Sequence, residues 1–134
     1  MDVAALESLK AQLEGDFYWG EGMRILYATD ASAYREKPLA VAIPKTKKDL
    51  STLIAFAQAQ GCALIPRAAG TSLAGQVVGA GIVVDISKHF TAILELNVEE
   101  SWVRVEPGVI RDALNSYLFF FNDTATTEIY TANR

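Results

Sequence analysis

Apolar residues recur along the chain first with a helical period. Residues 3–14 carry four apolar side chains at near-helical spacing, with Asp2 in front as a candidate cap and Gly15 behind as a candidate stop. The next stretch, residues 17–38, is rich in aromatic and turn residues but has no clean period. We expect an amphipathic helix followed by an irregular docking segment, whose aromatic side chains need a surface to bury against.

From residue 39 the pattern becomes regular. The run "LAVAIP" predicts a short strand, and Thr46 stands three residues before Asp49, the spacing of a capping box. Apolar residues at i, i+3, i+4 and i+7 then predict one helical stripe, and Gly61 suits a left-handed C-terminal cap. The stripe consists of Leu50, Leu53, Ile54 and Ala57.

A second strand, "CALIPR", follows that helix, so strand, helix and strand succeed one another as in a right-handed βαβ unit. Further strands are predicted in "GIVVDIS", "AILELN" and "SWVRVEP", and a last helical stripe runs through Ile110, Ala113, Leu114 and Tyr117. The pattern therefore predicts one α+β subdomain, with a small mainly parallel sheet, a βαβ unit and flanking helices.

Composition narrows the function classes. The 134 residues carry a formal charge of −4, and the basic residues are scattered, which argues against a nucleic-acid partner. No apolar run is as long as a membrane span and the N-terminus lacks a signal-peptide pattern, so we expect a cytoplasmic protein. With one cysteine, Cys62, and one histidine, His89, the chain lacks the ligand set for a metal site. We expect Cys62 in a core and His89 near a surface turn.

Candidate chemistry lies in the glycine-rich run "PRAAGTSLAGQVVG", residues 66–79. Glycine lets backbone amides approach an anion closely, and Thr71 and Ser72 add hydroxyl donors. The spacing of Gly70 and Gly75 begins like a Walker A loop, but Gln76 and Val77 stand where lysine and a hydroxyl residue are needed. The dinucleotide fingerprint also fails, because a strand and not a helix follows the glycines. Two readings stay open here: an anion-binding loop, or a plain connection with tight turns.

A family resemblance adds to this reading. The stretches "PLAVAIPKTKKDLSTLIAFAQAQGCALIPRAAGTSLAGQVVGAGIVVDISKH" and "ILELNVEESWVRVEPGVIRDALN" resemble the FAD-linked oxidase family with the PCMH-type flavin domain, and the likeness spans residues 25–118. More narrowly the chain is similar to the D-lactate, glycolate and D-2-hydroxyglutarate dehydrogenases. The resemblance implies FAD as cofactor, a small 2-hydroxy acid as substrate and, since some members continue into one, an iron–sulfur domain or subunit as partner.

The same resemblance implies the site residues. In the family the corresponding loop wraps the FAD pyrophosphate, and "EPGV" resembles a segment near the adenosine half of the cofactor. The implied contacts are Ala68, Ala69, Gly70, Thr71, Ser72, Leu73, Gly75, Gln76, Pro107 and Gly108. Family members place their catalytic residues further along, so none is assigned here.

The end of the chain departs from the family. Residues 119–131 read as a translated sequencing adapter, since "NDTATTEIYT" is what an adapter sequence encodes in frame, and residues 132–134 resemble family sequence again. We divide the chain into 1–38, 39–118 (the N-terminal part of the FAD-binding domain), 119–131 and 132–134, and we expect a fragment that is inactive alone.

Two functions from different classes are kept. The first is the FAD-binding fragment of a flavin-dependent oxidoreductase that oxidises a 2-hydroxy acid by hydride transfer. The alternative is a non-catalytic nucleotide-binding or interaction module that uses the same loop.

Overall fold

The structure is a computed structural model that describes residues 2–119, and these form two units, of which the first ends at Phe90 and the second begins at Thr91. The predictions for residues 119–131 and 132–134 lie outside the described residues, apart from Phe119. The first unit contains α1 (Val3–Gln12), β1 (Asp16–Tyr18), α2 (Glu21–Leu26), β2 (Ala40–Ile43), α3 (Lys47–Gln60), β3 (Leu64–Arg67) and β4 (Ile82–Asp85). The second contains β5 (Ile93–Asn97), β6 (Trp102–Val105) and a helix over 111–119.

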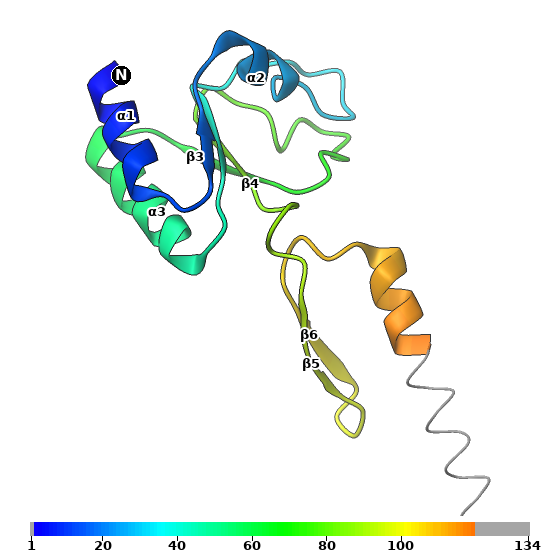
Figure 1. Cartoon of the computed structure of the whole chain (residues 1–134). Helices are drawn as coiled ribbons and strands as arrows, with labels where there is room; N and C mark the ends of the chain where they lie inside the picture. Colours follow the sequence, from blue (N-terminus) through cyan, green and yellow to red (C-terminus); the bar gives the residue numbers. More distant parts are fainter. Residues whose placement is uncertain (1, 120–134) are drawn as a thin grey trace, which may run out of the picture. The chain divides into compact units, whose positions relative to one another are not determined.

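The first unit is built on a four-stranded sheet with the order β1-β2-β4-β3 (Figure 1). β2, β4 and β3 are parallel and β1 is an antiparallel edge, which confirms a small, mainly parallel sheet. The predicted βαβ unit is β2-α3-β3, with β4 inserted between its two strands.

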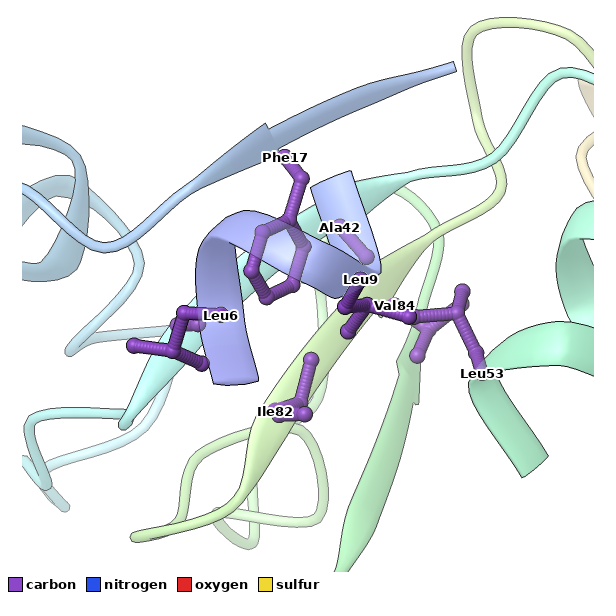
Figure 2. Packing of buried hydrophobic residues seen from close by; sticks show 8 residues of the cluster. Leu6, Leu9, Phe17, Ala42, Leu53, Ile82 and Val84 are labelled. Carbon is purple, nitrogen blue, oxygen red and sulfur yellow. The ribbon is translucent and has the colours of Figure 1, made fainter. Parts of the chain in front are cut away.

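Opposite faces of this sheet are covered by different segments. α1 and α3 lie side by side on one face, where their leucines meet alternate residues of β2 and β4 (Figures 1 and 2). This core consists of Leu6, Leu9, Phe17, Ala40, Ala42, Leu53, Ile82 and Val84. Val41 and Val83 are also fully buried and, by strand alternation, point to the other face. α2 and the long connection from β3 to β4 lie on that side (Figure 1).

Chain topology explains where the long connection runs. The β2-to-β3 crossover moves across the sheet in one direction and the β3-to-β4 crossover moves back. Right-handed crossovers that run in opposite directions place their connections on opposite faces. The connection over 68–81 contains no helix or strand, although a helix usually fills such a crossover. A long irregular connection of this kind is typical of a functional segment.

Helix caps follow the sequence closely. Asp2 accepts a hydrogen bond from the Ala4 amide, Thr46 and Asp49 form the predicted capping box, and Gly61 ends α3 in the left-handed conformation. The prediction that Gly15 ends the first helix is wrong, because α1 ends at Gln12 and its C-terminal cap is Leu13, which has extended backbone. Gly15 has a different role: a Cβ there would lie 2.2 Å from the Ile43 carbonyl oxygen, so a strand backbone occupies the space of a side chain.

Other sequence predictions are adjusted by the structure. The segment expected to be irregular contains β1 and α2, and Phe17 of β1 is fully buried. Ile54 is 59% exposed, because α3 buries the line of Asp49, Leu53 and Ala57 and turns the predicted stripe partly to solvent. Cys62 packs partly buried against the core, and His89 lies in a turn, as predicted.

The second unit is a hairpin followed by a helix. β5 and β6 pair antiparallel with an irregularity between Ile93 and Glu95, which confirms the two predicted strands. The Val109 amide donates to the Glu106 carbonyl, which closes a turn with Pro107 and Gly108 at its centre before the helix.

Candidate functional site

The candidate site is the first part of the β3-to-β4 connection, residues 68–79, which we call the glycine-rich loop. It leaves the carboxyl end of β3, the edge of a parallel sheet where ligands bind in open α/β folds. Gly70 and Gly75 adopt φ values of 67° and 71°, which side chains rarely tolerate. The loop backbone therefore takes a conformation that glycine at these two positions makes accessible.

Free hydrogen-bond donors line the start of the loop. Within the described part of the chain, Ala68, Ala69, Thr71 and Leu73 make no hydrogen bond. All four residues are exposed, and Leu73 is 80% exposed although it is apolar. Such a row of unpaired amides can bind an anion through their dipoles. Backbone donors of this type fit the diphosphate of a dinucleotide, which needs donors and no catalytic lysine.

Ser72 fixes the second half of the loop. Its hydroxyl donates to Oε1 of Gln76 at 2.5 Å and accepts from the Gln76 amide at 3.1 Å and the Ala74 amide at 3.3 Å. The hydroxyl therefore closes a small turn around Gly75. The structure gives Ser72 and Gln76 a role within the loop, and their role as cofactor contacts stays a prediction.

Arg67, at the end of β3, lies directly against the loop. A Cβ at Gly70 would be 2.5 Å from its Nη2, and Nη1 donates to the Thr29 carbonyl at 2.7 Å. The guanidinium also lies over the Tyr27 ring, 5.1 Å from the ring centre. From the sequence no role was assigned to Arg67, although this residue immediately precedes "AAGTS".

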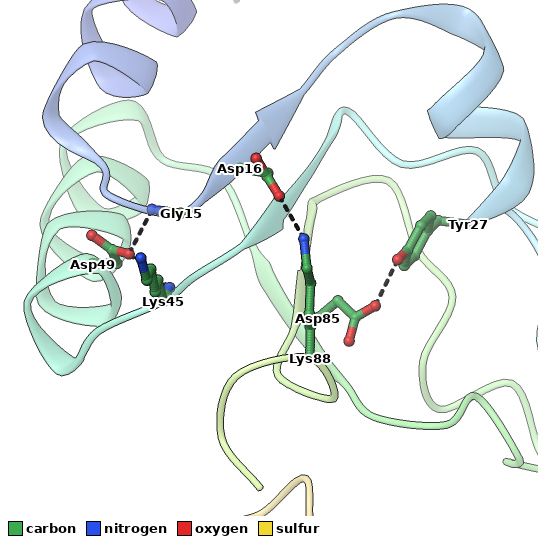
Figure 3. A network of polar contacts seen from close by, with 7 residues as sticks. All are labelled: Gly15, Asp16, Tyr27, Lys45, Asp49, Asp85 and Lys88. Carbon is green, nitrogen blue, oxygen red and sulfur yellow. Dashed lines mark hydrogen bonds and ion pairs between the residues drawn. The ribbon is translucent and has the colours of Figure 1, made fainter.

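A hydrogen-bonded pair of side chains, Tyr27 and Asp85, lies at the same edge of the sheet. Asp85, at the end of β4 opposite Arg67 in the strand register, accepts from the Tyr27 hydroxyl at 2.6 Å, as Figure 3 shows. Ser87 donates to the other oxygen of Asp85 through its amide and its hydroxyl. Burial and the hydrogen bond to Asp85 raise the pKa of Tyr27 to about 12, so this phenol stays protonated as a donor at neutral pH.

Asp30 is a second carboxylate on the loop side. Hydrogen bonds from Ser32 chiefly lower the pKa of Asp30, and the Val77 amide and the charge of Arg67 contribute to the same shift. Its Oδ1 accepts from the Ser32 amide and hydroxyl. Its Oδ2 is buried and has no hydrogen-bond partner of good geometry among the described residues. The carboxylate is therefore held in place from one side only.

Pro107 and Gly108 belong to the second unit. Gly108 is buried and Pro107 is exposed in the turn before the last helix. Their turn geometry is explained without a ligand, and cofactor contact at these two positions stays a prediction. A hollow of about 250 Å³ in this unit is lined by other residues, namely Leu96, Asn97, Val98, Ser101, Trp102, Val103 and Leu118.

Two further kinds of site are absent from residues 2–119. No group of three or more potential metal ligands gathers there. No helix in that range is long and apolar enough to cross a membrane.

Comparison with known proteins shows the family to which the chain is similar. The chain matches the FAD binding domain family over residues 38–129. It is 41% identical over 133 residues to D-2-hydroxyglutarate dehydrogenase of Haemophilus influenzae and to that of Escherichia coli, covering 96% of this chain and 13% of each relative. It is 36% identical over 87 residues to the mitochondrial D-lactate dehydrogenase [cytochrome] of Kluyveromyces lactis, which covers 62% of this chain and 15% of that relative.

Solved structures share the fold. An alkyldihydroxyacetonephosphate synthase superposes with a TM-score of 0.73 at 16% identity, over 89% of this chain and 27% of that one. p-Cresol methylhydroxylase, in a structure with substrate bound, gives 0.69 at 15% identity, over 90% and 25%. The chain thus spans a small part of each relative, and from this family match and these likenesses it belongs to the FAD binding domain family, in its PCMH-type fold.

Proposed function

We propose that the chain is the diphosphate-binding part of a flavin-dependent dehydrogenase or oxidase that acts on a 2-hydroxy acid of the D-lactate, glycolate or D-2-hydroxyglutarate class. The observation that carries the cofactor is the row of unpaired amides beside two left-handed glycines in the glycine-rich loop. The substrate class rests on the relatives that are 41% identical along nearly the whole chain.

In this proposal the loop binds the FAD diphosphate through its backbone. The amides of Ala68, Ala69, Thr71 and Leu73 donate to phosphate oxygens, the Thr71 hydroxyl adds a donor, and the glycines keep side chains out of the way. Ser72, Gly75 and Gln76 hold the turn that follows, and Pro107 and Gly108 contact the adenosine half. When bound, FAD supplies the acceptor for the hydride that leaves the α-carbon of the hydroxy acid. We assign no catalytic residue to this chain.

The whole protein extends the proposal. An iron–sulfur domain or subunit would take electrons from the flavin, and we propose a cytoplasmic location. Each of these properties belongs to the full-length protein. The relatives are about eight times as long as the segment matched here, since 13% of the relative is covered.

A titration of FAD against the chain tests the cofactor. A ligand present at about one hundred times its Kd raises the free energy of unfolding by about 2.7 kcal/mol, which thermal shift and flavin fluorescence both detect. We expect Gly70→Ala to abolish this shift, because alanine strains the φ of 67° and its Cβ meets Arg67. Gly22→Ala is the matched control, since nothing lies within 4 Å of a Cβ in that helix. Binding by Gly70→Ala at wild-type affinity would refute the loop assignment.

A chimera tests the activity. Residues 1–118 replace the matching segment of the Escherichia coli D-2-hydroxyglutarate dehydrogenase, and flavin reduction by a panel of 2-hydroxy acids is followed by absorbance. Reduction by one member of the panel supports the proposal. A chimera that binds FAD but is reduced by none of them supports the non-catalytic module instead.

A further inference from the structure

Residues 27–36, between α2 and β2, lie against the glycine-rich loop at two points, Gly70 and Gly75. At the start of the loop the Ala31 amide donates to the Gly70 carbonyl at 3.0 Å, and Arg67 donates to the Thr29 carbonyl at 2.7 Å. The two bonds run in opposite directions across the same junction. They connect the 27–36 segment to the loop backbone at its first left-handed glycine.

The second left-handed glycine is contacted by the same segment. A Cβ at Gly75 would lie 2.7 Å from Cδ2 of Tyr34 and 2.9 Å from its Cγ. The Tyr34 ring therefore occupies the space in which a side chain at residue 75 would sit. Both positions where the loop needs glycine are thus positions where this segment, or the arginine bonded to it, packs on the loop.

The 27–36 segment is itself ordered by local bonds. Thr29 and Arg35 form an isolated antiparallel bridge, and the Glu36 amide donates to the Ala28 carbonyl at 2.9 Å. Inside this bridge Asp30 accepts from Ser32, whose hydroxyl in turn accepts from the Tyr34 amide at 3.1 Å. These local bonds give the 27–36 segment a defined conformation of its own, so it can hold the glycine-rich loop in one conformation.

Arg67 brings positive charge to the same junction. Its guanidinium packs on Gly70 and over the Tyr27 ring, whose hydroxyl is bonded to the buried Asp85. The charge is therefore fixed beside the free amides of Ala68, Ala69 and Thr71. A fixed cation strengthens the attraction of amide dipoles for an anion, and this attraction falls as salt screens the charge.

We propose that Arg67 and the 27–36 segment form a brace that presets the glycine-rich loop for the diphosphate, with Arg67 as a positioning residue that also supplies charge. This inference rests on the proposed function for its ligand. The brace itself rests on contacts within the first unit. Preorganisation of this kind removes the cost of ordering the loop when the ligand binds.

The test compares Arg67→Met, which removes the charge, with Arg67→Lys, which keeps it without the planar fork. FAD affinity is measured by flavin fluorescence at low and at high NaCl concentration. We expect Arg67→Met to weaken FAD binding by about tenfold, the loss typical of one interaction with a charged group, and to flatten the salt dependence. Arg67→Lys should keep the salt dependence. Lys48→Met, which removes an exposed cation on α3, should change neither.

A second readout does not depend on FAD. Amide hydrogen exchange at Ala31 reports the bond to Gly70 directly, and we expect it to quicken in Arg67→Met and stay unchanged in Lys48→Met. If the wild-type chain binds no FAD, the proposed function fails, and the exchange at Ala31 alone decides on the brace. If FAD binds to Arg67→Met as tightly and with the same salt dependence as to wild type, and Ala31 exchange is unchanged, the brace is overturned while the cofactor assignment stands.

Discussion

Asp49 should be the polar residue whose loss costs this fold most. Asp49 is 0% exposed, and its two carboxylate oxygens accept from four backbone amides, of which that of Gly15 is drawn in Figure 3. Oδ1 accepts from Glu14 at 2.9 Å, and Oδ2 accepts from Gly15 at 3.0 Å, Lys45 at 2.8 Å and Thr46 at 3.3 Å. One carboxylate thus joins the α1-to-β1 turn to the start of α3.

The magnitude follows from these bonds. A hydrogen bond to a charged group contributes about 1.5–3 kcal/mol, so a simple sum over four bonds would exceed the whole stability of most domains. The sum overshoots, because the contributions of several bonds to one group are not additive. We expect Asp49→Ala to lower the free energy of unfolding by about 3–5 kcal/mol, as for a buried charge network that loses one member. Asp49→Asn keeps one acceptor oxygen and should lose about 2 kcal/mol.

Urea unfolding followed by circular dichroism measures both losses. Glu7→Ala, on the exposed side of α1, is the control and should change stability by less than about 0.5 kcal/mol. A loss below about 1 kcal/mol for Asp49→Ala would refute the reasoning, because removing a buried carboxylate that accepts four amide hydrogen bonds should cost more than that.

The pH dependence has a definite sign. Burial opposes the charge of Asp49, but the four amides outweigh it and lower its pKa below the usual value. A carboxyl with a lowered folded-state pKa adds stability above its unfolded pKa of about 3.9, and this stability is lost as the pH falls towards the folded value. Wild type should therefore lose stability below about pH 4 more steeply than Asp49→Asn.

Two other residues give sharp expectations. Gly15→Ala places a Cβ 2.2 Å from the Ile43 oxygen and should lower the free energy of unfolding by about 1–3 kcal/mol or more, measured by thermal melting against Gly22→Ala. Tyr27→Phe removes the bond to Asp85 and should remove the last phase of an alkaline titration at the tyrosinate absorbance band, because the pKa of Tyr27 is raised to about 12. Since that folded pKa lies above the unfolded value of about 10, the stabilising effect of Tyr27 is complete below pH 10 and is lost as the pH rises towards 12. If Tyr27→Phe instead lowered the tyrosinate signal near pH 10 and left the last phase in place, the phenol would not be shielded.

The sequence pattern predicted the elements whose conformation depends on residues that are close together in the chain. The capping box at Thr46, the left-handed cap at Gly61 and the helix from Val3 each depend on residues within one turn, so the sequence contains their whole explanation. The glycine-rich loop was also visible, since its glycines stand directly after a strand. That its first amides lack hydrogen-bond partners is a finding of the structure.

Elements with a non-local cause were missed. β1 is three residues long, too short to show a period, and it is a strand because Phe17 pairs with Ala42, 25 positions further along the chain. α2 has six residues and contains Gly22, which gives it little propensity of its own. Ile54 fits the helical stripe but is exposed, because the sheet and α1 receive the neighbouring line of residues instead.

The site shows the same division between local and non-local causes. A glycine that is free to take a positive φ does not by itself fix the loop, because the same freedom is available in the unliganded and the unfolded chain. What selects one conformation is the packing on those glycines, and here it comes from Arg67 and Tyr34. A family match that begins at residue 38 contains Arg67 and omits Tyr34, so the domain as delimited by sequence leaves out half of the contacts that shape its own loop. Affinity for the cofactor should therefore depend on residues 27–36 as well as on the loop that binds it.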